Sequence, residues 1–161
     1  MRLIRAMTLS LLLTGCASAP PSPEPVHPAT TGWSGMADGR PAAAFFASCA
    51  AALAQKVMLI PSGEREASPE LYAGIGRYVR LSCVASSPDQ AHVQYLLERE
   101  KASGKTAADL GACAGEPNCV DRVHKDMDAL LMRCVAYQRQ NAGIIAGLAP
   151  ATVAQCAKDK L

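Results

Sequence analysis

The spacing of apolar residues between positions 41 and 161 most constrains the fold of this chain. In this region, apolar side chains recur every three or four residues, as on one face of a helix. They do not alternate with polar residues, as they would in a half-buried strand. The sequence therefore predicts an all-α fold, a small helical bundle of about five helices.

Start and stop signals place these helices along the chain. The first is expected from Pro41 to Pro61, and the last from Ala149-Pro150 to Lys160. The second and third begin at Ser68-Pro69-Glu70 and near Ser87-Pro88-Asp89, and the third ends before Gly104. The stripes expected to face inward, in chain order, are Phe45, Cys49, Leu53, Val57; Tyr72, Ile75, Val79, Cys83; Val93, Leu96, Leu97; Val120, Val123, Met127, Leu130, Leu131, Cys134, Tyr137; and Val153, Cys156.

The first sixteen residues have the organisation of an export signal. Arg2 and Arg5 precede a mainly apolar run from Ala6 to Leu13, which is too short to span a bilayer as a permanent helix. The next residues complete Leu13-Thr14-Gly15-Cys16, which resembles the lipobox of bacterial lipoproteins. The resemblance implies cleavage of residues 1–15 and acylation of the Cys16 thiol. Acyl chains would then anchor the protein to a membrane without spanning it.

The residues after Cys16 indicate where the anchor would lie. In lipoproteins, a residue other than Asp at this point usually allows sorting to the outer membrane, and Ala17 and Ser18 fit that pattern. Residues 16–40 read as a tether, because five prolines between Pro20 and Pro28 favour an extended chain. We therefore expect a domain at 41–161 facing the periplasm of a Gram-negative bacterium.

The cysteines predict how this domain is stabilised. With Cys16 acylated, six of the 7 cysteines remain, and an even number in an oxidising compartment indicates three disulfides. Pairing between sequence neighbours joins consecutive helices and closes one tight turn. The predicted pairs are Cys49–Cys83, Cys113–Cys119 and Cys134–Cys156.

Catalytic and metal-binding patterns are weak. Cys113, Cys119 and His124 offer three possible zinc ligands, but their spacing differs from that of paired CxxC knuckles. A P-loop is excluded because Arg99 stands where that motif requires the first glycine before Gly104. We predict no enzyme, metal or cofactor. The alternative is an envelope hydrolase or redox enzyme, which would need a polar cleft around His92, His124 or a free thiol.

Net charge and local hydrophobicity limit the classes of partner that the chain can bind. The net charge of +2 comes from Arg2 and Arg5, so residues 16–161 are neutral and a nucleic-acid partner is unlikely on electrostatic grounds. The connection around Ile144, Ile145 and Leu148 is apolar where loops are usually polar. It either caps the end of the bundle or forms a contact patch for another protein.

The combined architecture favours a non-enzymatic protein-binding module. A lipid-anchored helical domain is similar in architecture to pilotins, which support outer-membrane secretion channels. It is also similar to immunity lipoproteins, which neutralise toxins in the periplasm. Both comparisons imply a partner that is another envelope or secreted protein.

Overall fold

The computed structural model describes residues 36–37, 39–65, 68–148 and 150–158. The predicted signal peptide, the lipobox with Cys16, and residues 16–35 of the tether lie outside the described residues. Within the described part, seven helices and one two-stranded sheet form the fold. The all-α prediction is confirmed.

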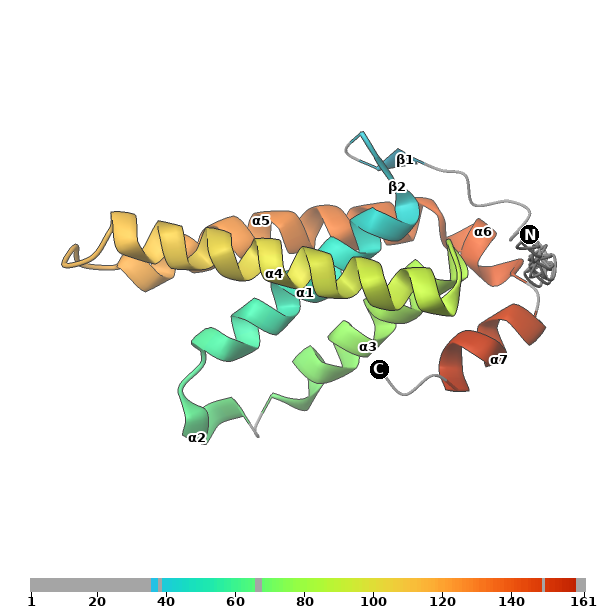
Figure 1. Cartoon of the computed structure of the whole chain (residues 1–161), viewed down its shortest axis with the longest axis horizontal. Coiled ribbons are helices and arrows are strands. Elements are labelled where there is room, and N and C mark those ends of the chain that lie inside the picture. The colour runs from blue at the N-terminus through green and yellow to red at the C-terminus, as the bar shows by residue number, and fades with distance from the viewer. Residues whose placement is uncertain (1–35, 38, 66–67, 149, 159–161) are drawn as a thin grey trace, which may run out of the picture.

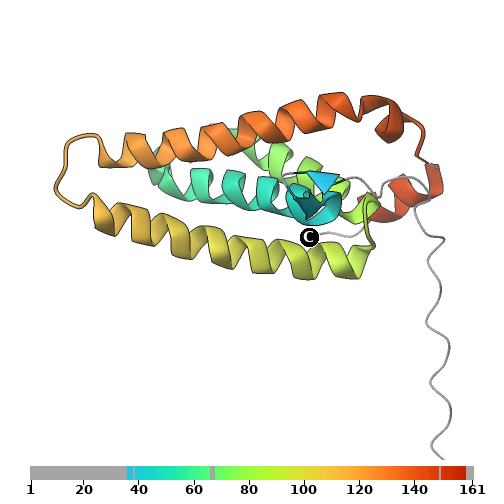
Figure 2. The same ribbon diagram turned by 90° about the horizontal axis from the view of Figure 1, so that it is seen from above.

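Helix α1 (Ala42–Leu59) is the central element of the bundle. It contacts α3 (Pro69–Val84), α4 (Pro88–Ala112) and α5 (Cys119–Gln140). Figure 2 places α1 between α4 and α5, and Figure 1 shows that both α4 and α5 run along the length of the molecule. By length and composition α1 also qualifies as a membrane span, but 72% of it is buried inside the protein. Packing therefore accounts for its apolar composition.

The expected limits of the first helix are confirmed. Pro41 is its N-cap, and Ile60 has extended backbone geometry before Pro61. Its expected stripe of Phe45, Cys49, Leu53 and Val57 is buried. Small side chains at most other positions, many of them alanine, let the neighbouring helices approach α1 closely.

Helix α4 differs from expectation because it continues through Gly104 to Ala112. It begins as expected, with the Ser87 hydroxyl accepting a hydrogen bond from the backbone N–H of Gln90 at 3.3 Å. One glycine inside a helix costs only about 1 kcal/mol relative to alanine, which tertiary packing can offset. The helix ends at a turn in which Gly115 and Asn118 have positive φ angles of 84° and 63°.

Short elements complete the fold. Strands β1 (Met36–Ala37) and β2 (Arg40–Pro41) pair antiparallel, and Ala37 is buried in the main core. The packed unit therefore begins upstream of the predicted boundary at residue 41. The remaining helices are α2 (Ser62–Arg65), α6 (Ala142–Ala146) and α7 (Pro150–Lys158), of which the sequence predicts only α7.

The core is centred on aromatic rings from three helices. Phe45 and Phe46 of α1 both contact Tyr137 of α5, with ring centroids 5.3 and 5.6 Å apart. Phe46 also stacks with Tyr78 of α3 at 6.1 Å. These four rings join α1, α3 and α5.

Three disulfides staple the bundle, and two of the three predicted pairings are wrong. The structure joins Cys49 to Cys134, Cys83 to Cys156, and Cys113 to Cys119, so only the turn disulfide is as predicted. Cys49 lies one turn from Phe45, on the face of α1 that packs against α5. Cys83, at the end of α3, meets α7 instead. Spatial contact between helices, and not their order in the chain, decides the pairing.

Several residues predicted to face inward are exposed. Tyr72, Val120 and Val153 retain 49%, 46% and 43% of their accessible surface. Each lies near the start of its helix, where fewer neighbouring elements cover the stripe. Further along, Val79, Met127 and Cys156 are buried as expected.

Candidate functional site

The residues suggested by sequence as a partner surface are divided between the core and solvent. Ile145 of α6 and Leu148 just after it both pack against the main hydrophobic core. Ile144 is 43% exposed. This segment therefore caps the end of the bundle through two of its three apolar side chains, and only Ile144 faces outward.

A different apolar surface lies on α4. Val93, Leu96 and Leu97 are 55%, 46% and 50% exposed, although the sequence pattern predicts that they are buried. We call these three residues the α4 row. Their spacing of three and four residues places them on one side of the helix. The row presents three large aliphatic side chains on the outer side of α4.

Small residues explain why α4 turns this side outward. Its packed face carries Ala91 at 0% exposure and Thr106 at 7%, with Tyr95 and Ala102 half-buried between them. These positions also follow helical spacing, and their mostly small side chains allow α4 to approach α1. Small residues at helical spacing are the sequence signal for this packed face.

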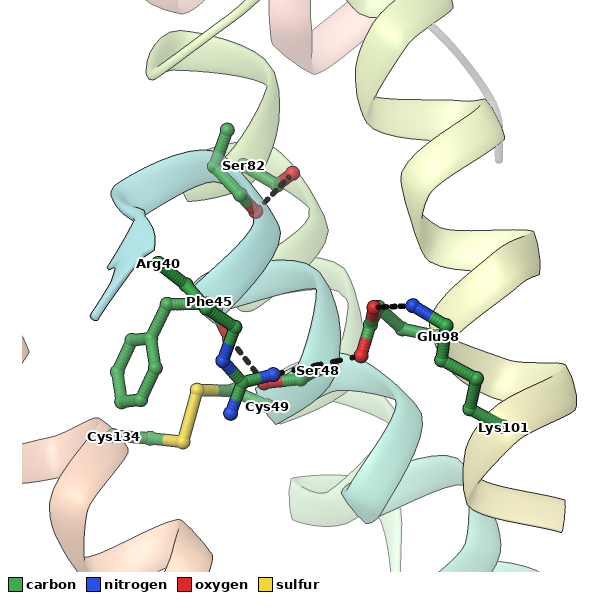
Figure 3. A network of polar contacts seen from close by, with 9 residues as sticks. Arg40, Phe45, Ser48, Cys49, Ser82, Glu98, Lys101 and Cys134 are labelled. Atoms are coloured by element: carbon green, nitrogen blue, oxygen red, sulfur yellow. Dashed lines mark hydrogen bonds and ion pairs between the residues drawn. A yellow bond between two sulfur atoms is a disulfide. The ribbon is translucent and has the colours of Figure 1, made fainter. Parts of the chain in front are cut away.

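Glu98 connects α4 to the β-hairpin. Its carboxylate lies 3.7 Å from the Arg40 guanidinium and 2.7 Å from the Lys101 ammonium, and the Glu98 side chain is only 14% exposed. Figure 3 shows Glu98 between these two basic residues. The Glu98 side chain is therefore mostly covered, and its ion pair with Arg40 links α4 to β2.

The two candidate catalytic histidines are not brought together. His92 is near the start of α4 and His124 is near the start of α5. Because α4 and α5 are antiparallel, these histidines lie toward opposite ends of the helix pair (Figure 2). In the described part of the chain, all six cysteines form disulfides, so Cys113 and Cys119 present no thiolate for a metal.

A cavity of about 170 Å³ lies among α1, α4 and α5, on the side of α4 opposite the α4 row. Lys105 and Asp109 of its lining form an ion pair, with the ammonium 2.5 Å from the carboxylate. The hydrogen bond with Asp109 raises the pKa of Lys105 above its ordinary value, and the charges of Asp109 and Asp126 add to this effect. The lining residues are Ala52, Gln55, Ala102, Lys105, Thr106, Asp109, Val123, Asp126, Met127, Leu130 and Arg133.

A second hollow lies at the α4–α5 turn and shares Asp109, Val123 and Asp126 with the first. It also contains Glu116, whose carboxylate pairs with Arg122 at 2.8 Å. Among the described residues, no three His, Cys, Asp or Glu side chains cluster in a way that could hold a metal ion. Comparisons with family models, with curated proteins and with solved structures find no match to this chain.

Proposed function

We propose that this chain is a non-enzymatic protein-binding module, held at the periplasmic side of the outer membrane by acyl chains on Cys16. The observation that carries the proposal is the α4 row. Three adjacent large aliphatic side chains, each about half exposed, form a patch of the kind found at protein interfaces. The lipobox-like sequence supports the location.

The geometry of the row favours an amphipathic helix as the partner element. Val93, Leu96 and Leu97 have the spacing of a helix seam, which can accept the apolar stripe of a second helix. Exposed Arg99 and Glu100 border the row and provide both charge signs at its edge. The partner helix would therefore be apolar along one side and carry mixed charges beside it.

Disulfide-linked packing suits this role. Helix α4 packs on α1, and Cys49–Cys134 ties α1 to α5. A surface fixed in advance loses little conformational entropy on binding. Two roles use such a module: support of an outer-membrane secretion channel, and neutralisation of a toxin that enters the periplasm. The identity of the captured protein separates them.

The experiment is site-specific photo-crosslinking in intact envelopes, using the full lipidated chain. A benzophenone amino acid replaces Leu97 in one strain and Met132 of α5 in the other. Met132 is the matched control because it is 70% exposed but lies outside the α4 row. We expect a specific crosslinked protein from position 97 and none from position 132, with mass spectrometry identifying it as a channel component or a toxin.

A substitution tests whether Leu97 contributes to the affinity for the captured protein. Leu97→Asp is expected to reduce recovery of that protein by at least about tenfold, while the melting temperature stays close to that of the unmodified chain. Met132→Asp should leave both quantities unchanged. Equal crosslinking from the two positions, or undiminished recovery with Leu97→Asp, contradicts the proposed surface.

A further inference from the structure

The cavity among α1, α4 and α5 has the composition of a small ligand site. Most of its wall is apolar, including Ala52, Ala102, Met127 and Leu130. A mainly apolar wall with a few polar groups is the usual composition of sites for small organic molecules. This cavity is separate from the α4 row, because its α4 residues lie on the inner side of that helix.

Two uncharged polar groups are buried in the lining. Gln55 of α1 is 8% exposed and Thr106 of α4 is 7% exposed. For the described residues, the structure records no hydrogen bond from either side chain to another residue. Their polar atoms keep some contact with solvent, because neither residue is among those with a fully buried, unpartnered polar atom. Both groups can donate and accept, so a hydroxyl group on a ligand suits them.

The balanced charges of the lining favour a neutral ligand. The formal charges of Lys105 and Arg133 balance those of Asp109 and Asp126. Lys105 is already paired with Asp109. An ion in the cavity would lose part of its hydration and would face lining charges that balance one another.

The volume limits the ligand to one ring. About 170 Å³ is close to the roughly 150 Å³ of an apolar protein cavity that accommodates benzene. We propose that this cavity binds a phenol group, with the ring against Ala102, Met127 and Leu130 and the hydroxyl bonded to Gln55 and Thr106. The phenol belongs either to a small free molecule or to a tyrosine side chain.

Methionine methyl groups provide a local test with the full chain in lipid nanodiscs. Met127 lines the cavity, whereas Met132 on the same helix is exposed and serves as an internal reference. We expect p-cresol to shift the NMR signal of the Met127 methyl group saturably, with Kd below about 1 mM. The Met132 signal should stay in place, and the free p-cresol concentration is corrected with empty nanodiscs.

Matched probes and variants measure separately what the ligand hydroxyl contributes to binding and whether binding requires the open cavity. Toluene, which lacks the hydroxyl, should bind at least about tenfold more weakly than p-cresol. Thr106→Val keeps the side-chain shape and should reduce this preference. Ala102→Leu fills the cavity and should abolish the Met127 shift. Ala107→Leu makes the same change at an exposed position of α4 outside the cavity lining, and it should preserve the shift.

N-acetyltyrosinamide distinguishes the two sources of the phenol. Binding at least as tight as that of p-cresol identifies a tyrosine side chain of a peptide, and exclusion of this larger probe identifies a free molecule. The proposal is overturned if p-cresol leaves Met127 unshifted, shifts Met127 and Met132 equally, or binds folded Ala102→Leu as well as it binds Ala107→Leu. None of these readouts depends on the proposed protein partner.

Discussion

The Ser82 hydroxyl donates a hydrogen bond to the backbone carbonyl of Ala43 at 2.8 Å, which links α3 to α1 across 39 residues of sequence (Figure 3). Ser82 is 0% exposed. Ser82→Ala removes this link and should lower the free energy of unfolding by about 1 kcal/mol. Urea denaturation of the oxidised protein measures the change.

Ser48 is the matched control for this substitution. It is also buried, but its hydroxyl donates to the carbonyl of Phe45 within α1, at 2.7 Å. Both serines are helical, so alanine gains the same helix propensity at each position, and only Ser82→Ala removes a bond between helices. Ser48→Ala should therefore cost less than Ser82→Ala. The reverse order would mean that the bond between α1 and α3 contributes little.

The disulfides predict a graded loss of stability. Cys49–Cys134 closes a sequence separation of 85 residues, whereas Cys113–Cys119 closes a separation of 6. In the chain-entropy model, these closures contribute up to about 4–5 and about 2 kcal/mol. Cys49→Ala with Cys134→Ala should therefore lower the urea midpoint more than Cys113→Ala with Cys119→Ala.

Peptide mapping under non-reducing conditions checks the connectivity on which this prediction rests. Peptides containing Cys49 and Cys134 should be recovered together, as should those containing Cys83 and Cys156. Recovery of a Cys49–Cys83 peptide would contradict the observed pairing. If both double variants shift the urea midpoint equally, loop length does not determine the stabilisation.

The sequence predicts the first helix well and the pairing of its cysteine poorly. Pro41 and Pro61 mark the ends of α1 through local backbone geometry, which requires no knowledge of other elements. Cys49 is different, because α1 has neighbours on several sides and its partner depends on which helix lies beside that face. Local rules give helix limits, whereas pairing requires the three-dimensional arrangement.

The candidate surfaces show a related limit. Helix α4 carries two helical stripes, one of large aliphatic residues that include Leu97 and one of small residues that include Ala91. Hydrophobicity alone favours burial of the larger stripe. The structure instead buries Ala91 and Thr106, because small side chains permit close packing on α1. The cavity also depends on three helices and has no signature in any single segment.

Two glycines are expected to respond differently to alanine substitution. A Cβ atom at Gly104 would have no neighbour within 4 Å, so Gly104→Ala should stabilise α4 by up to about 1 kcal/mol. A Cβ atom at Gly74 would lie 2.8 Å from Cδ1 of buried Leu53. Movement of Leu53 should offset the gain in helix propensity there. Thermal unfolding of both variants tests the contrast, and equal stabilisation would contradict it.

The segment that caps the bundle contains two adjacent isoleucines, Ile144 and Ile145, that should respond differently to substitution. Ile145 packs on the core, so Ile145→Asp should destabilise the protein by a few kcal/mol through burial of a charge. Ile144 is 43% exposed, and Ile144→Asp should cost roughly 0.5 kcal/mol or less. Urea denaturation measures both. Similar small losses would show that the segment does not cap the core.

Ionisation of the Tyr78 phenol makes the free energy of unfolding depend on pH in the alkaline range. Burial raises the pKa of its phenol above the ordinary 10.0, and the charge of Arg77 only partly opposes this shift. The unfolded chain therefore loses this proton at lower pH than the folded chain. The stability contribution is complete below pH 10 and is lost as pH rises through the folded-state pKa.

Removing the Tyr78 hydroxyl should therefore make the protein less sensitive to alkali. Between about pH 8 and about pH 11, Tyr78→Phe should lose less unfolding free energy than the unmodified chain. Tyr72→Phe is the control, because this ring is 49% exposed and the change leaves Tyr78 in place. Urea midpoints measured across this pH range give the comparison. Parallel curves for Tyr78→Phe and the unmodified chain would show that the Tyr78 phenol ionises equally easily in the folded and unfolded states.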